Sequence, residues 1–116
     1  MNKRTTGAAY ERIAGAFLEK QGYQIIACNF RCRLGEIDLI AEKNGVLCFI
    51  EVKTRQIGGM TSPAEAVNVH KQENIKSAAS VYLNRWAKTD KYRFDIIEVF
   101  LDGKEVQKIN HLPDVF

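Results

Sequence analysis

The sequence predicts one three-layer α/β domain in which helices cover a mixed β-sheet. Three observations predict it: an N-terminal segment with apolar residues at helical spacing, several short apolar segments separated by turn signals, and a second helical segment between two later strands. At 116 residues the chain can bury one core but is too short for two independent domains. We therefore expect residues 1–116 to form a single domain.

The first half of the chain is expected to form a helix followed by three strands. Residues 5–21 carry apolar side chains at helical spacing, and Gly22 is expected to end that helix. The strands are expected over residues 23–30, 36–43 and 46–55. Asn44 and Gly45 separate the last two strands, and this pair favours a two-residue type I′ turn because both residues tolerate a positive φ.

The second half is expected to add a helix and two strands. Residues 56–61 predict a loop, and Ser62 to Glu65 have the pattern of a capping box that begins a helix, with Asn68 as a possible break. The expected core stripe of the helix is Ile75, Ala79, Tyr82, Leu83 and Trp86. A strand over 92–101, a turn at Asp102-Gly103 and a strand over 105–109 complete the order α-β-β-β-α-β-β. The strand–helix–strand passage predicts a parallel pair.

Composition excludes several classes of protein. No run of about 18 apolar residues is present, so no membrane span is expected. The N-terminus has positive charge but no apolar stretch behind it, which argues against a secretory signal and favours the cytoplasm. The formal net charge of +3 permits nucleic-acid binding without requiring it.

The cysteines and histidines do not predict a disulfide or a zinc site. Cys28 and Cys32 are about 13 Å apart in an extended segment, which is too far for a disulfide. With Cys48 they are interpreted as thiols in a reducing compartment. His70 and His111 have no companion ligands at zinc spacing.

The Asn-Gly turn fixes the register of the strands on either side of it. With a two-residue loop, positions 43 and 46 face each other and pairing continues outward. Asp38 then lies directly opposite Glu51, and Glu36 directly opposite Lys53, with all four side chains on one face. The other face is wholly apolar and is expected to be core: Ile37, Leu39 and Ala41 against Val52, Ile50 and Cys48.

Two facing carboxylates destabilise a sheet unless something offsets their repulsion. A divalent cation does so, because hard cations prefer carboxylate and carbonyl oxygens. Lys53, on the same face as Glu51, is placed to hold a scissile phosphate or to orient a water. The alternative is a solvated hairpin face in which Glu36 and Lys53 form an ordinary salt pair. The metal site is favoured because the two strands are otherwise very apolar and Asp is a poor strand former.

These segments resemble a known nuclease superfamily. Residues 35–40 (GEIDLI) and 49–55 (FIEVKTR) are similar to the D…ExK signature of PD-(D/E)xK nucleases. Together with Tyr10-Glu11 and residues 93–97 (RFDII), they resemble the YraN-like family of bacterial proteins, which is related to archaeal Holliday-junction resolvases. The resemblance covers about residues 7–109 and implies a restriction-endonuclease-like αβββαβ core.

The resemblance also implies roles for individual residues. Asp38 and Glu51 would be metal ligands for Mg²⁺ or Mn²⁺, the Val52 carbonyl would complete the site, and Lys53 would be the catalytic lysine. Glu11 would lie near the same metal from the first helix. Glu11 shares a helix face with three small or apolar residues, Ala14, Gly15 and Leu18, although a solvent-exposed Glu is the alternative.

Basic residues near the carboxylates predict contacts with nucleic acid. Arg33, Arg55 and Lys71 are the candidates for phosphate binding. Arg93 and Asp95 share a strand face, where a structural salt bridge and a functional role are both open. Three aromatic residues, Phe17, Tyr82 and Trp86, have core spacing and are interpreted as packing.

The function expected from these residues and the resemblance is metal-dependent cleavage of DNA, with branched or structured DNA among the expected substrates. The alternative is a non-catalytic module that binds nucleic acid or protein, and action on RNA also stays open. A homodimer would suit a branched substrate, as the resemblance to resolvases implies.

Overall fold

The computed structural model describes residues 3–58, 68–87 and 89–116 and confirms the predicted α/β fold. Its elements are α1 (Lys3–Lys20), β1 (Gln24–Cys32), β2 (Gly35–Lys43), β3 (Val46–Gln56), α2 (Val69–Trp86), β4 (Tyr92–Asp102) and β5 (Glu105–Leu112). The five strands and two helices are consistent with a restriction-endonuclease-like fold. Within the described ranges, neither helix has the length and apolarity needed to cross a membrane.

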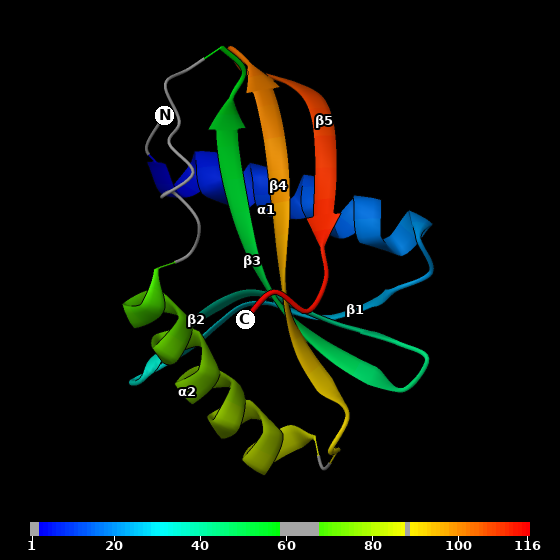
Figure 1. The fold of residues 1–116 in the computed structure, drawn as a ribbon, viewed down its shortest axis with the longest axis vertical. Coiled ribbons are helices and arrows are strands. Elements are labelled where there is room, and N and C mark those ends of the chain that lie inside the picture. The colour runs from blue at the N-terminus through cyan, green and yellow to red at the C-terminus, as the bar shows by residue number, and fades with distance from the viewer. Residues whose placement is uncertain (1–2, 59–67, 88) are drawn as a thin grey trace.

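The sheet is mixed, and the helices lie on its two faces. The strand order is β1-β2-β3-β4-β5. β3 and β4 run parallel on either side of the α2 crossover, as predicted, and the other pairs are antiparallel. Figure 1 shows α1 behind the sheet and α2 in front of it, with β1 and β2 turned across the direction of the other three strands.

The predicted β2–β3 register is confirmed up to a definite point. Asn44 and Gly45 have positive φ angles of 54° and 78°, and the ladder runs from Lys43–Val46 to Leu39–Ile50. Beyond that rung β2 pairs only with β1, and β3 only with β4. The two strands therefore diverge just where Asp38 and Glu51 begin.

Two hydrophobic clusters form the core, one under each helix. The cluster under α1 contains Leu39, Ala41, Cys48 and Ile50, as predicted. Ile37 was expected with them, but it packs under α2 with Ile75. The physical reason is that β2 leaves β3 after Leu39, so the regular alternation of the hairpin faces does not extend to Ile37.

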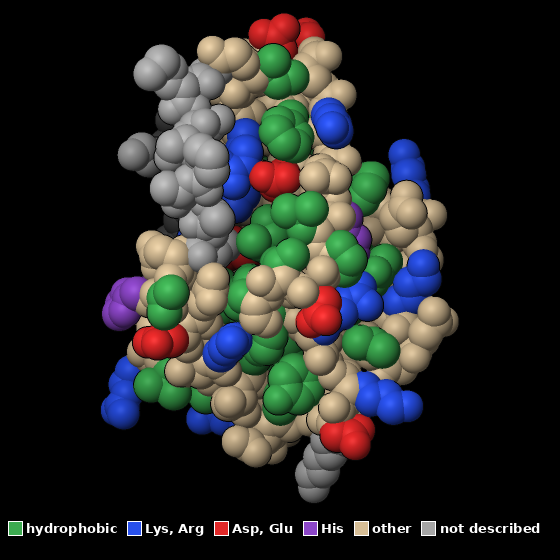
Figure 2. Space-filling view, in the orientation of Figure 1, with side chains coloured by type: hydrophobic (Ala, Val, Ile, Leu, Met, Phe, Trp, Pro, Cys, Tyr) green, Lys and Arg blue, Asp and Glu red, His purple; other side chains and the backbone are tan. Residues whose placement is uncertain are grey.

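The ends of α2 differ in part from the expectation. Asn68 is its N-cap and accepts a hydrogen bond of 2.8 Å from the Lys71 backbone N–H. The predicted capping box at residues 62–65 lies outside the described residues. Trp86 was expected in the core but is 59% exposed, because it is the last residue of α2 and the chain becomes extended at Ala87. Figure 2 shows hydrophobic side chains gathered on this face of the molecule, with charged side chains around them.

The β4–β5 turn lies one residue later than predicted. Asp102 pairs with Glu105, so Gly103 and Lys104 form the two-residue turn. Gly103 has a φ of 62°, a value that favours glycine. A register irregularity between Phe100 and Leu101 accompanies the shift.

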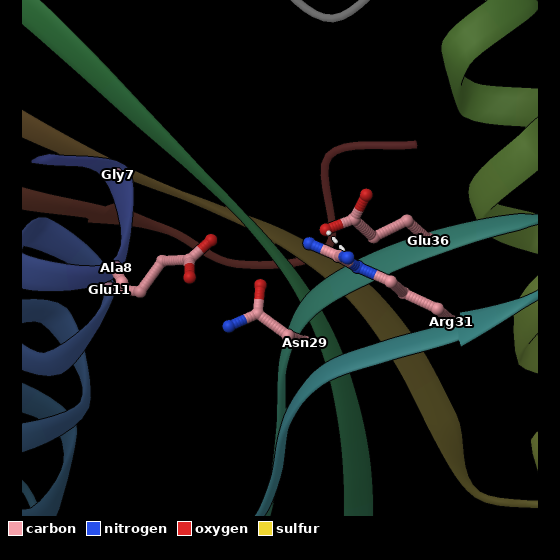
Figure 3. A pocket seen from close by; sticks show the side chains of 6 residues that line it. All are labelled: Gly7, Ala8, Glu11, Asn29, Arg31 and Glu36. Carbon is pink, nitrogen blue, oxygen red and sulfur yellow. Dashed lines mark ion pairs between the residues drawn. The ribbon is translucent and has the colours of Figure 1, made fainter. Parts of the chain in front are cut away.

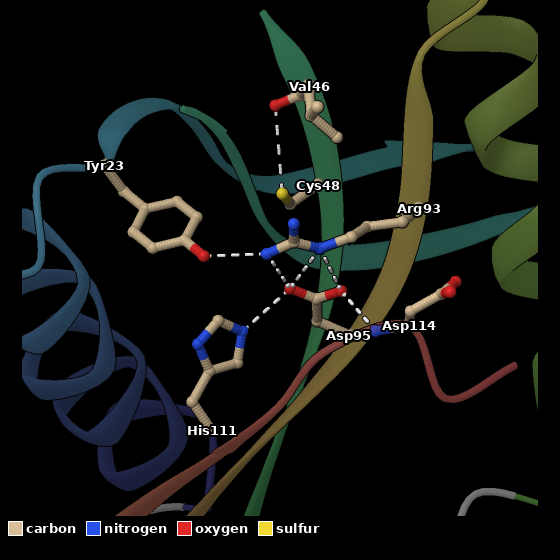
Figure 4. A network of polar contacts seen from close by, with 7 residues as sticks. All are labelled: Tyr23, Val46, Cys48, Arg93, Asp95, His111 and Asp114. Carbon is tan, nitrogen blue, oxygen red and sulfur yellow. Dashed lines mark hydrogen bonds and ion pairs between the residues drawn. The ribbon is translucent and has the colours of Figure 1, made fainter. Parts of the chain in front are cut away.

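A buried carboxylate, Asp95, ties the C-terminal part of the chain to the sheet (Figure 4). It receives hydrogen bonds from the Arg93 guanidinium at 3.0 Å and from the Asp114 backbone N–H at 2.9 Å, and it contacts His111 Nε2 at 2.7 Å. Arg93 also donates to the Tyr23 hydroxyl at 2.7 Å. Arg93 and Asp95 thus form a structural salt bridge, which was one of the two open possibilities.

The partners of Asp95 outweigh the cost of burying its charge. Burial by itself raises the pKa of the Asp95 carboxyl, but the hydrogen bonds from His111, Arg93 and the Asp114 amide hold it below its ordinary value. The ionised form is therefore the one that the fold stabilises.

We predict that Asp95→Ala lowers the free energy of unfolding by about 3–5 kcal/mol, because it leaves Arg93 without its buried counter-ion. Urea denaturation at pH 7 measures the change. Asp90→Ala, at an exposed aspartate, is the control and should fall within about 0.5 kcal/mol of the parent. A similarly small loss in both variants would contradict a stabilising role for the network.

Candidate metal and nucleic-acid site

Asp38 and Glu51 meet where β2 and β3 separate. Glu51 is 4% exposed, and Asp38 is partly buried. The Val52 backbone N–H donates a hydrogen bond of 2.8 Å to Asp38 Oδ2. A side-chain oxygen thus takes the place that the next strand carbonyl would have filled, so Asp38 is fixed against β3 by a backbone group.

Glu11 approaches the same place from α1. Ala14 and Leu18, on the same side of the helix, are fully buried against the sheet. A Cβ on Gly15 would lie 3.9 Å from Ile25, so α1 packs closely on β1 at this point. Glu11 is close enough for its charge and a hydrogen bond to raise the pKa of Asp38. The expectation that Glu11 lies on the site-facing side of its helix is therefore consistent with the structure.

The Glu11 carboxylate points into a cavity of about 380 Å³ between α1 and the β1–β2 hairpin (Figure 3). Its lining includes Gly7, Ala8, Asn29, Arg31 and Glu36. Arg31 and Glu36 form an ion pair at 3.3 Å on adjacent strands, with each side chain about half exposed. This cavity gives solvent and small groups access to the Glu11 carboxylate.

The acidity of the two central carboxylates is suppressed. Burial is the main cause that raises the pKa of Asp38 to about 6, opposed by the Val52 N–H and reinforced by Glu11. Burial likewise raises the pKa of Glu51 to about 7, with the charge of Asp38 as the next cause and Lys71 opposing it. Nearby cationic charge therefore favours the ionised forms of both groups.

Lys71 supplies part of that charge. Its Nζ lies 2.5 Å from Glu51 Oε1, and Glu51's side chain is only 5% exposed. Burial by itself lowers the pKa of Lys71, but the hydrogen bond and charge of Glu51 raise it overall. The sequence predicted a phosphate contact for Lys71 but not this ion pair with Glu51. A signal was available, because a lysine in the first turn of a helix opposes the helix dipole and favours an acidic partner nearby.

The donor set fits a hard divalent cation. Glu11, Asp38 and Glu51 provide carboxylate oxygens, and Val52 provides a carbonyl beside them. Within the described part of the chain, however, no three acidic, histidine or cysteine side chains already form a closed cluster for a metal. The Lys71 ammonium lies directly against Glu51, so a cation bound by Glu51 would have to replace it.

The expected Glu36–Lys53 salt pair is not found among the described contacts. Glu36 pairs with Arg31, its neighbour in the β1–β2 ladder, because β2 no longer follows β3 at this point. Lys53 is partly buried and lies beside Glu98 in the β3–β4 ladder. Its catalytic role stays a prediction.

The two arginines that were candidates for phosphate binding differ in how available they are to a ligand. Arg55 forms an ion pair with Glu98 at 2.6 Å, and both side chains are about 15% exposed. A phosphate contact by Arg55 would therefore compete with this pair. Arg33 is exposed at the β1–β2 turn and lines a second cavity together with Lys71. Of the two, Arg33 is the better placed for nucleic acid.

We predict that Asp38→Asn stabilises the metal-free protein at pH 8. The folded-state pKa of Asp38 is raised, so its contribution to stability is fully present below about pH 4 and is lost as pH rises through about 6. The amide oxygen of asparagine can still accept from Val52, and the gain should be roughly 1–3 kcal/mol. Denaturation in EDTA from pH 4 to 8 measures it.

Asp102→Asn, at an exposed acid, is the matched control and should leave the pH profile unchanged. Adding Mn²⁺ should raise the melting temperature of the parent more than that of Asp38→Asn. Identical pH profiles for the parent and Asp38→Asn would show that burial of Asp38 carries no electrostatic cost.

Comparison with known proteins assigns this chain to a family. The chain is similar over its full length to UPF0102 proteins of Caldicellulosiruptor bescii (46% identity, 100% of both chains), Alkaliphilus oremlandii (47%, 100% of both) and Caldanaerobacter subterraneus (44%, 100% of this chain and 98% of the relative). The model of the uncharacterised protein family UPF0102 matches residues 10–99, a range that includes Glu11, Asp38, Glu51 and Lys71. The chain therefore belongs to the UPF0102 family, which is the YraN-like group.

Proposed function

We propose that this protein is a metal-dependent endonuclease that hydrolyses phosphodiester bonds in DNA. The observation that carries the proposal is the buried pair Asp38–Glu51, whose pKa values are raised to about 6 and 7 at the point where two strands diverge. Such a pair costs stability without a cation, and carboxylates with strongly perturbed pKa values are typical of functional sites. Branched DNA and a homodimer that acts on it are parts of the same proposal.

In the proposed mechanism each residue has a separate task. Asp38, Glu51, Glu11 and the Val52 carbonyl would hold Mg²⁺ or Mn²⁺. When bound, the metal would polarise the phosphate and make a bound water more acidic. The Val52 N–H keeps the Asp38 carboxylate oriented. Lys53 would orient the attacking water or the phosphate.

Lys71 has two partners in this mechanism. Without metal it neutralises Glu51 at 2.5 Å, and its side chain is 45% exposed on the cavity side. When a cation takes over Glu51, the ammonium would be free to contact a phosphate in that cavity. Metal loading and phosphate binding would then support each other.

The same ion pair is the observation that favours a second candidate function. A lysine that permanently neutralises Glu51 would make the site a non-catalytic module that binds nucleic acid or protein. Metal binding and cleavage distinguish the two.

We predict cleavage of at least one DNA in a panel of duplex, flap and four-way-junction substrates with Mg²⁺ or Mn²⁺, and none in EDTA. Asp38→Ala and Glu51→Ala should each reduce the rate by about 100-fold or more, because each removes a direct metal ligand. Glu105→Ala, at an exposed acid on β5, is the control and should retain full activity. Cleavage that survives in both site variants would have another source.

We predict that Lys71→Met lowers the melting temperature of the metal-free protein at pH 8, because it leaves Glu51 buried without its counter-charge. The same variant should bind Mn²⁺ about 10-fold more tightly than the parent, equivalent to about 1.4 kcal/mol, since no ammonium competes for Glu51. Calorimetric titration measures the affinity. Lys76→Met, on the same helix with its ammonium over Phe94, is the control. Unchanged or weaker Mn²⁺ binding by Lys71→Met alone would contradict the competition.

A further inference from the structure

The tip of the β1–β2 hairpin presents an apolar side chain between charged ones. Cys32 pairs with Gly35, so Arg33 and Leu34 form a two-residue turn. Leu34 is 51% exposed and belongs to neither hydrophobic cluster. Arg31 and Arg33 precede it, and both are exposed. The core therefore gives no reason for a leucine at this position.

The hairpin tip is held firmly against α2. A Cβ on Gly35 would lie 2.4 Å from the carbonyl oxygen of Asn74 and 2.9 Å from its carbonyl carbon, both backbone atoms. Only glycine permits this approach without a shift of the hairpin or the helix. Leu34, the residue before Gly35, therefore adjoins a backbone position that is packed closely against α2.

The tip and the candidate metal site adjoin one cavity. Leu34, Arg31, Arg33 and Lys71 all line a space of about 480 Å³ between the hairpin and the first turns of α2. From this cavity the Lys71 side chain reaches the Glu51 carboxylate at 2.5 Å. Lys71 therefore connects the cavity at the apolar tip to the Glu51 carboxylate.

A second cavity extends the same surface toward α1. The 380 Å³ cavity with Glu11 shares Arg31 and Glu36 with the 480 Å³ cavity (Figure 3). The shared ion pair is half exposed, so either side chain can turn to a ligand at low cost. A phosphate backbone that follows the two cavities from Arg33 would pass Lys71, the partner of Glu51, on its way to Glu11.

We propose that Leu34 is a wedge that inserts at the junction between paired and unpaired DNA, next to the phosphate that is cut. This inference rests on the proposed function and specifies its substrate class. Proteins that insert an apolar side chain between base steps surround it with basic side chains that hold the phosphates, as Arg31 and Arg33 do here. Unstacking costs least where pairing has already ended, so a fork or branch is favoured over continuous duplex.

The wedge differs from the rest of the basic surface in what it contributes. Phosphate contacts from the arginines add affinity for any DNA. Leu34 has no charge and no hydrogen-bonding group, so its contribution depends on bases that are open to contact. Loss of Leu34 should therefore reduce the preference for a fork much more than the affinity for duplex.

The experiment measures base unstacking and binding in EDTA, so that no cleavage interferes. Forked DNA with 2-aminopurine at the branch reports unstacking by a rise in fluorescence, and anisotropy reports affinity for fork and duplex. The full-length parent is compared with Leu34→Ala, Leu34→Met and Val106→Ala. Val106 is a partly exposed apolar residue on β5, at the opposite edge of the sheet.

The parent, Leu34→Met and Val106→Ala should all raise the fluorescence and prefer the fork. Leu34→Ala should abolish most of the rise and lower the fork-over-duplex preference about 10-fold, while duplex affinity stays the same. Its melting temperature should match that of the parent, because Leu34 lies outside both core clusters. If Leu34→Ala does not fold, the uncharged Leu34→Gln serves instead, with the same expected loss.

Two results overturn the inference. Parent-like fluorescence and fork preference in Leu34→Ala would show that Leu34 is no wedge, while metal-dependent cleavage would still support the nuclease. Equal loss in Val106→Ala would show an effect unrelated to the hairpin tip. A fluorescence rise that depends on Leu34, without cleavage of any DNA under any metal, would retain the wedge and overturn the proposed nuclease.

Discussion

The hydrogen bond from the Val52 N–H to the Asp38 carboxylate is the contact on which the site depends. The β2–β3 ladder ends at Leu39–Ile50, and this bond satisfies the first backbone donor of β3 that has lost its strand partner on β2. A buried backbone N–H without a partner costs free energy comparable to a lost hydrogen bond, so strands seldom part inside a sheet. Because Asp38 fills that role with a side chain, β2 can leave β3 without an unsatisfied amide. The carboxylate is also held in one orientation as a result.

The divergence of β2 and β3 places like charges together, and the stability of the rest of the fold offsets the electrostatic cost. Glu51 is almost fully buried beside Asp38. Burial raises the pKa of both carboxyls, and the charge of Asp38 raises the pKa of Glu51 further. The two hydrophobic clusters contain neither acid, and the hydrogen bonds that join Asp95 to Arg93 and His111 involve neither acid. A site that is unfavourable for stability yet supported by an otherwise well-satisfied structure is what selection for function produces. No buried side-chain polar atom among the described residues lacks a hydrogen-bond partner, which agrees with this division.

The sequence predicted the local features well and the long-range ones less well. The order of elements, the Asn44-Gly45 turn and the hairpin register follow from residues that are close in the chain. The first two are confirmed, and the register is confirmed from Lys43–Val46 to Leu39–Ile50 but is wrong for the predicted pairs Asp38–Glu51 and Glu36–Lys53. The predicted register placed Asp38 opposite Glu51, but it assumed that the β2–β3 ladder continues past Leu39–Ile50. The β2–β3 ladder ends where β2 stays paired with β1 and β3 stays paired with β4. The sequence of the hairpin alone does not show where these other pairings take over. The same cause explains Ile37 in the wrong cluster and the missing Glu36–Lys53 pair, while the Lys71–Glu51 contact depends on where a helix 20 residues away is docked.

The strand divergence also explains why the carboxylates, the cavities and the hairpin tip lie together. Once β2 leaves β3, it remains paired with β1, and the two strands turn as a unit across the sheet (Figure 1). That turn brings Gly35 against the Asn74 carbonyl of α2 and so positions Arg33 and Leu34 beside Lys71. A hairpin that had stayed in register with β3 would give a fully paired sheet, without the hairpin tip beside Lys71. The geometry that creates the charged site is therefore the same geometry that aims an apolar residue at its edge, and a substrate that needs both a cation and an opened base stack is the one that uses the whole surface.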